Sequence, residues 1–188
     1  MTLFLVEPPG REPVSRDEAK AYLKVETNDE DVLIDTLIAA ARLHVEAATR
    51  RVLISQSWRM VLDGWPPRRR VEIPLSPVLS IDAVTVYDDA GDPSVLPTTE
   101  WLADTVSSPA RVLVREAVEP GAAFNGIEID LTAGYGPDGE DVPAPLRMAI
   151  LQLVAQWHET REPVAFGAVA EVPASVAALT APYRVVAL

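Results

Sequence analysis

Two histidines are the side chains of this sequence that could begin a zinc site. His158 precedes Glu159 in a segment with helical spacing, which resembles half of a zinc-protease motif. That motif needs a second histidine four residues after the first, and position 162 is glutamate. His44 lies in a different predicted helix, and the sequence has 0 cysteines to supply thiolate ligands. The sequence therefore predicts no metal site and no cofactor.

Two loops resemble fragments of ligand-binding motifs. Asp88, Asp89 and Asp92 recur as in a calcium loop, but the ordered ligand series and the closing glutamate are missing. Residues 134–139 (GYGPDG) are glycine-rich, yet they contain neither the lysine of a phosphate-binding loop nor dinucleotide-binding spacing. The first loop is predicted to be a hairpin turn, and the second to join a strand to a helix.

Catalysis by a nucleophile has no recognisable basis in the sequence. There is no G-x-S-x-G motif and no cysteine nucleophile. Carboxylate pairs are abundant, so an enzyme that acts on carbohydrate through such a pair remains an alternative. Their abundance also means that no pair stands out. The sequence therefore predicts a protein that is not an enzyme, with no catalytic residues.

One basic cluster has an aromatic neighbour. Arg68, Arg69 and Arg70 follow Trp65 and two prolines. The cluster could contact phosphate or an acidic partner, or it could be a solvated loop between strands. The formal net charge of the chain is −12, so three arginines are too few to hold DNA by neutralising phosphates. The loop is a candidate contact with another subunit.

The elements that position these residues fall into helical and strand-forming regions. Ser15 and Glu18 have capping-box spacing and predict a helix over about 16–24. Asn28 and the acidic residues behind it predict a second helix over 29–50. Its expected buried stripe is Leu33, Leu37, Ala40, Ala41, His44 and Ala48. Ile34, Ile38 and Val45 widen this stripe enough to suggest contacts on two sides of the helix.

The periodicity changes to two between residues 52 and 132. Strands are expected at about 57–62, 71–74, 81–87, 111–115 and 127–131. A third long helix is predicted over 144–160, and its expected buried face is Leu146, Ala149, Ile150, Leu153 and Trp157. The fold class is therefore α+β: a helical bundle from N- and C-terminal helices with an inserted antiparallel β subdomain.

The predicted organisation has four parts. Residues 1–51 hold the N-terminal helices, 52–141 the inserted β subdomain, 142–162 the helix that completes the bundle, and 163–188 an apolar docking arm. An apolar content of 48% is enough for a core, and no run is long enough to span a membrane. The first ten residues have no basic segment before their apolar run, so we expect a protein that is neither exported nor membrane-bound.

Four stretches resemble the head–tail connector (adaptor, or head completion) proteins of long-tailed phages and gene transfer agents. They are PVSRDEAKAYLKV with NDEDVLI at 13–34, TRRVLISQSW at 49–58, TAGYG with VPAPL at 132–146, and APYR at 181–184. The stretches follow the family's order and cover most of the chain. The β region between them resembles the family only in its strand-forming pattern and not in specific motifs.

This resemblance implies a structural protein of the virion or phage-like particle, located at the head–tail junction and assembled in the bacterial cytoplasm. Copies would form a ring, twelvefold by analogy, beneath the portal protein. The ring would join the DNA-filled capsid to the stopper or tail proteins, and DNA would pass through it without specific binding. The residues that would contact the portal are Leu179, Pro182, Tyr183, Arg184 and Val185.

Two alternatives remain beside the connector. One is the carbohydrate enzyme described above. The other is a tail stopper or tube protein, which would be mostly β without strong helices at both ends.

The docking arm at 163–188 has two possible states. If it is a free docking segment, removing residues 178–188 would leave the melting temperature nearly unchanged. If it caps its own bundle, the truncated protein would unfold.

Overall fold

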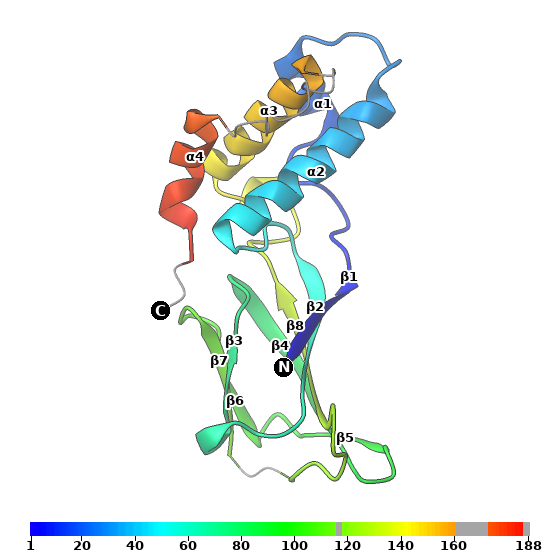
Figure 1. Ribbon diagram of the computed structural model, residues 1–188, viewed down its shortest axis with the longest axis vertical. Coiled ribbons are helices and arrows are strands. Elements are labelled where there is room, and N and C mark those ends of the chain that lie inside the picture. Colours follow the sequence, from blue (N-terminus) through cyan, green and yellow to red (C-terminus); the bar gives the residue numbers. More distant parts are fainter. Residues whose placement is uncertain (116–117, 161–172, 186–188) are drawn as a thin grey trace, which may run out of the picture. The chain divides into compact units, whose positions relative to one another are not determined.

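The computed structural model describes residues 1–115, 118–160 and 173–185 and confirms the α+β class (Figure 1). Its strands are β1 Thr2–Glu7, β2 Gln56–Leu62, β3 Arg70–Ile73, β4 Val78–Tyr87, β5 Pro93–Val95, β6 Trp101–Asp104, β7 Ala110–Val114 and β8 Ile127–Ala133. Its α-helices are α1 Arg16–Leu23, α2 Asp31–Thr49, α3 Ala144–Glu159 and α4 Ala174–Thr180. Short 3-10 turns lie at η1 Pro67–Arg69, η2 Gly139–Asp141 and η3 Ala181–Tyr183.

The chain divides into two compact units. The β unit contains residues 1–10 and 55–135, and the helical unit contains residues 11–54 and 136–188. The predicted division grouped residues 1–10 with the N-terminal helices. The structure places them in the β unit because β1 pairs with β2 in antiparallel register, with Leu3 opposite Met60.

The β unit holds two antiparallel sheets. The larger has the strand order β1-β2-β8-β4-β5, and the smaller has the order β3-β7-β6. Strand β8 shows why the sequence forms this sheet, since Ile127, Ile129 and Leu131 are fully buried and alternate with polar residues. Figure 1 shows the smaller sheet facing the larger one, and its buried Val71, Ile73 and Val112 complete the core.

The other face of the larger sheet carries a polar network. The Arg59 Nε and Nη2 atoms donate to the two carboxylate oxygens of Asp130 at 2.6 and 3.0 Å. The same guanidinium lies 3.0 Å from Glu128, which also accepts a hydrogen bond from the Tyr87 hydroxyl at 2.9 Å. This hydrogen bond, together with burial, raises the pKa of Tyr87. The network ties β2, β4 and β8 together across their strands.

In the helical unit, the capping box of α1 forms as predicted. The Glu18 amide donates to the Ser15 hydroxyl, and the Ser15 amide donates to the Glu18 carboxylate. The start of α2 differs from the prediction. Glu30 is the N-cap and makes no side-chain cap hydrogen bond, whereas the Asn28 side chain accepts from the Lys20 ammonium at 2.7 Å. The ammonium thus satisfies the side chain that was expected to cap the helix.

The buried stripe of α2 is also shifted. Its buried residues are Ile34, Ile38, Ala41, Arg42, Val45 and Thr49. Ala41 of the predicted stripe is buried, and so are Ile34, Ile38 and Val45, which were predicted to widen it. The rest of the stripe is not buried: Leu33 is 37% exposed and Ala40 is exposed. Apolar residues occupy so much of this helix that their spacing alone does not select the face that turns inward.

Substitution by alanine should destabilise the protein to different extents at two leucines, Leu153 and Leu37, that the sequence periodicity predicts to be buried. Leu153 on α3 is 1% exposed, and Leu153→Ala should lower the unfolding free energy by about 2–5 kcal/mol. Leu37 on α2 is only partly buried, so Leu37→Ala should cost well under half as much. Urea denaturation of both variants measures this difference. Equal losses would contradict the placement of α2.

Candidate functional site

The C-terminal segment is docked on its own helical unit. Val176 and Thr180 of α4 are buried, and α4 packs against α3. Beyond the helix, the Arg51 Nε atom donates to the Tyr183 carbonyl at 2.6 Å, and the Val185 amide donates to the Thr49 carbonyl at 2.9 Å. These contacts fix both ends of the segment, so residues 174–185 are part of the folded unit.

The predicted portal-contacting residues divide into two groups. Leu179, Tyr183 and Val185 are partly buried, whereas Pro182 and Arg184 are exposed. The prediction missed the α4 helix because its seven residues contain no charge and do not show an amphipathic pattern over several turns. Residues 163–172 and 186–188 of the predicted arm lie outside the described residues. Of the five predicted contact residues, only Pro182 and Arg184 are therefore exposed.

The arginine loop has an unusual backbone. Arg68 and Arg69 have φ of 63° and 52°, a left-handed conformation that costs an L-residue roughly 1 kcal/mol each. Arg69 donates to the Arg115 carbonyl at 3.3 Å and lies 3.7 Å from Glu119, while Arg70 lies 3.1 Å from Glu72. Two of the three guanidiniums therefore face carboxylates of their own chain, and the Arg68 side chain is exposed.

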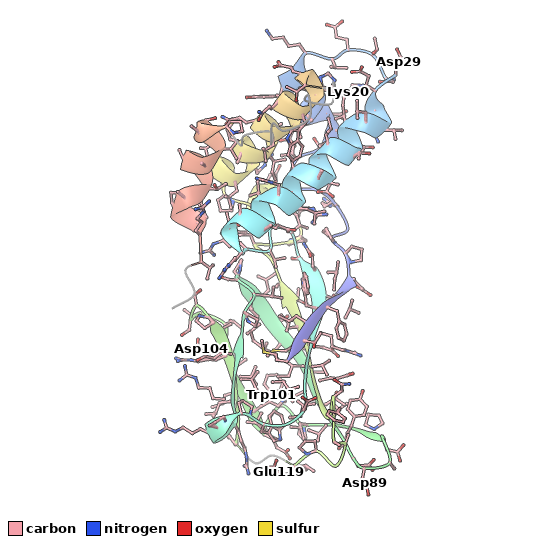
Figure 2. The ribbon with its side chains drawn as sticks, in the orientation of Figure 1. Lys20, Asp29, Asp89, Trp101, Asp104 and Glu119 are labelled. Atoms are coloured by element: carbon pink, nitrogen blue, oxygen red, sulfur yellow. The ribbon has the colours of Figure 1, made fainter. Side chains whose placement is uncertain are left out.

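The acidic hairpin is a turn, as the sequence predicts. The Asp88 carboxylate accepts hydrogen bonds from the amides of Ala90 and Asp92, both at 2.9 Å. Figure 2 shows Asp89 in the hairpin loop that leads into β5. Across the described residues, no group of three histidine, aspartate or glutamate side chains is placed to hold a metal ion.

The two histidines make separate contacts within the helical unit. The His158 Nε2 atom lies 2.8 Å from a Glu30 carboxylate oxygen, which links the end of α3 to the start of α2. His44 on α2 packs edge-on against Trp157, with ring centroids 6.1 Å apart. Both rings therefore take part in packing between helices.

The glycine-rich segment forms the predicted loop between strand and helix. It leads from β8 through η2 to α3. A Cβ atom at Gly136 would lie 2.2 Å from the Asp141 carboxylate, and one at Gly139 would lie 2.6 Å from the Pro13 carbonyl. Glycine at these positions therefore permits close backbone packing.

A cleft in the helical unit was not anticipated from the sequence. It has a volume of about 670 Å³, and its lining includes Arg11, Glu12, Arg16, Asp35, Asp138 and Arg147. Its charges come from segments far apart in the chain, and only the capping box at Ser15 signalled any part of it. Sequence spacing cannot show that these charges meet.

The arginines of the cleft are bound by carboxylates of the same chain. Arg11 pairs with Asp138 at 2.6 Å, Arg16 with Asp35, and Arg147 with Glu18. Burial alone would raise the pKa of Glu18, but hydrogen bonds from Ser15 and the Arg147 guanidinium outweigh it and lower that pKa. These pairs link α1, α2 and the start of α3, so the cleft has a structural role.

Within the described residues no helix is long and apolar enough to cross a membrane. No family model matches the chain, and no curated protein sequence matches it.

Solved structures of particle components do match the chain over its whole length. The neck of an empty gene transfer agent (GTA) particle, with C6 symmetry, aligns with a TM-score of 0.84 and 28% identity. The virion of a native GTA particle gives 0.81 and 26%, and the neck of a native GTA particle with C12 symmetry gives 0.77 and 27%. Each alignment covers 100% of this chain and 97% of the other. The chain is thus similar to structural components of GTA particles.

Proposed function

We propose that the chain is a structural head–tail connector, or adaptor, of a GTA or phage-like particle. It assembles as a ring under the portal protein and joins a DNA-filled capsid to the tail, leaving a channel for DNA. The observation that carries the proposal is the full-length likeness to a GTA neck structure, with a TM-score of 0.84 and 28% identity. The C6 and C12 symmetries of the matched necks support a ring of identical copies.

The charge of the chain fits a channel through which DNA slides. A formal net charge of −12 disfavours binding to the phosphate backbone, which supports passage of DNA without specific binding. The partners are further copies of the chain, the portal protein, and stopper or tail proteins. The site of action is the head–tail junction of the particle, after assembly in the bacterial cytoplasm.

The exposed side chains of the C-terminal segment and of the arginine loop are the proposed contacts with the portal and with another subunit. Pro182 and Arg184 project from the docked C-terminal segment and make the first contacts with the portal. Leu179, Tyr183 and Val185 support them from partly buried positions. Arg68, Arg69 and Arg70 form a contact with another subunit, where the exposed guanidinium of Arg68 meets a carboxylate.

The alternatives have less support. A stopper or tail-tube protein was expected to lack strong helices at both ends, whereas α2 and α3 have 19 and 16 residues. For the carbohydrate enzyme, Glu128 and Asp130 are a carboxylate pair in the β unit, but Arg59 binds both of them. This pairing gives the two carboxylates a structural role.

Electron microscopy of particles made without this protein tests the proposal. We expect DNA-filled heads that lack tails, because the capsid fills but has no platform for the tail. Supplying the intact gene in trans is the control and should restore tailed particles. Normal tailed particles in the deletion strain would refute the connector function.

A further inference from the structure

The outward face of α2 carries no charge along the length of the helix. Val32 is 81% exposed, Leu43 is 57% exposed and Leu33 is 37% exposed, and Ala40 and Ala47 are exposed on the same face. Its one exposed polar side chain, Thr36, donates its hydroxyl hydrogen to the Val32 carbonyl of the same helix. The charged side chains of α2 lie on another face. Arg16 pairs with Asp31 and Asp35, and Arg42 pairs with Glu46. An outer helix face is normally polar, so an uncharged one indicates a surface that another protein covers.

A second uncharged surface lies on α4. Ala174, Ser175, Ala177 and Ala178 are exposed, and the exposed Ala181 continues this surface. The sequence of α4, ASVAALT, contains no charged residue. The exposed side chains are small here, whereas those of α2 include valine and leucine.

The two surfaces lie on different helices of the helical unit. Helices α2 and α4 both pack against α3 and also contact each other, and Figure 1 shows α3 between them over most of their length. A ring of more than two identical copies requires two different surfaces on each copy, one for each neighbour. The flanks of α2 and α4 meet this requirement within one folded unit.

We propose that the exposed face of α2 in one copy packs against the exposed face of α4 in the next copy. This inference rests on the proposed function, which requires a ring. The large side chains of α2 enter the shallow surface formed by the alanines of α4, so the helices approach closely. Copies that each carry a net charge of −12 repel one another, and these charge-free flanks are where they meet without opposing carboxylates.

Site-directed cross-linking tests this pairing directly. The chain has 0 cysteines, so introduced thiols are the only ones present. A chain that carries both Leu43→Cys and Ala178→Cys, treated with a short bis-maleimide, should give a ladder of covalent multimers. The reaction is run on the purified full chain at high concentration and on assembled particles. The matched control replaces Ala178→Cys by Val106→Cys, at a β-unit position that is 96% exposed.

A ladder from the Leu43–Ala178 variant in either preparation, and none from the control, supports the pairing. Equal cross-linking of the two variants, or a dimer from Leu43→Cys alone that equals the double variant, would overturn it. Detecting the wild-type protein in purified tailed particles tests the proposed function separately. If the protein is present there and the ladder is absent, the connector function stands and the α2–α4 contact does not.

A charge substitution gives a second readout. Leu43→Glu should abolish multimer formation while the melting temperature stays unchanged, because Leu43 is not part of the subunit core. Adding Ala178→Arg to Leu43→Glu should restore multimers by placing opposite charges across the contact. Full assembly of the Leu43→Glu variant would refute the proposal.

Discussion

Removing residues 178–188 should lower the unfolding free energy by about 3 kcal/mol or more. The deletion removes Thr180, which is 2% exposed, and the Val185 amide that donates to Thr49. It also shortens α4 until Val176, which is 1% exposed, loses its helical support. The structure thus favours the arm that caps its own bundle over the arm that stays free.

The controls for this deletion are single substitutions on the exposed side of the same segment. Pro182→Ala and Arg184→Ala should change the unfolding free energy by less than about 0.5 kcal/mol. Urea denaturation followed by circular dichroism measures all three proteins. An unchanged midpoint after the deletion would mean that the docked segment contributes nothing to stability and would favour the free docking arm.

Replacing Arg42 by alanine should lower the unfolding free energy by about 3 kcal/mol. The Arg42 side chain is 10% exposed, and it pairs with Glu12 at 2.7 Å and with Glu46 at 2.9 Å. These two carboxylates raise the pKa of Arg42 against the opposing effect of burial. Without the guanidinium they face each other with little water to screen them.

Arg16→Ala is the matched control, because Arg16 also pairs with two carboxylates of the same unit, Asp31 and Asp35. Its side chain is 43% exposed, so water screens the pairs and the loss should be much smaller than for Arg42→Ala. Equal losses for the two variants would show that burial of Arg42 does not strengthen its ion pairs.

The parts of the fold that were predictable have one polar face and one buried face. Strand β8 alternates without exception, and Ser15 with Glu18 specifies the start of α1 through hydrogen bonds within four residues. Strand β1 was missed because its apolar residues are mostly exposed on both faces and therefore show no alternation. The buried side of α2 could not be chosen, since both of its long faces are apolar.

The exposure of the candidate contact residues also depends on tertiary packing, which their spacing in the sequence does not show. Spacing identified the apolar segment from Leu179 to Val185, but it could not show that Arg51 and Thr49 bind its backbone. The cleft was missed because Arg11 and Asp138 are far apart in the sequence. Only the folded chain separates the exposed Pro182 and Arg184 from their partly buried neighbours.

The position of β1 gives the chain an unusual modularity. Because residues 1–10 belong to the β unit, the chain passes between the units three times, and neither unit is one continuous segment. Glu7 lies opposite Ser57 in the sheet, and Ile54 pairs with Gly136 in an isolated bridge. We therefore expect that a short linker joining residue 10 to residue 55 would make the β unit a continuous chain. A second linker joining residue 54 to residue 136 would do the same for the helical unit, so that each unit could be expressed separately. In the gene, by contrast, residues 11–54 separate the two parts of the β unit, so a single recombination event cannot exchange the whole β unit while the helical unit keeps its own sequence.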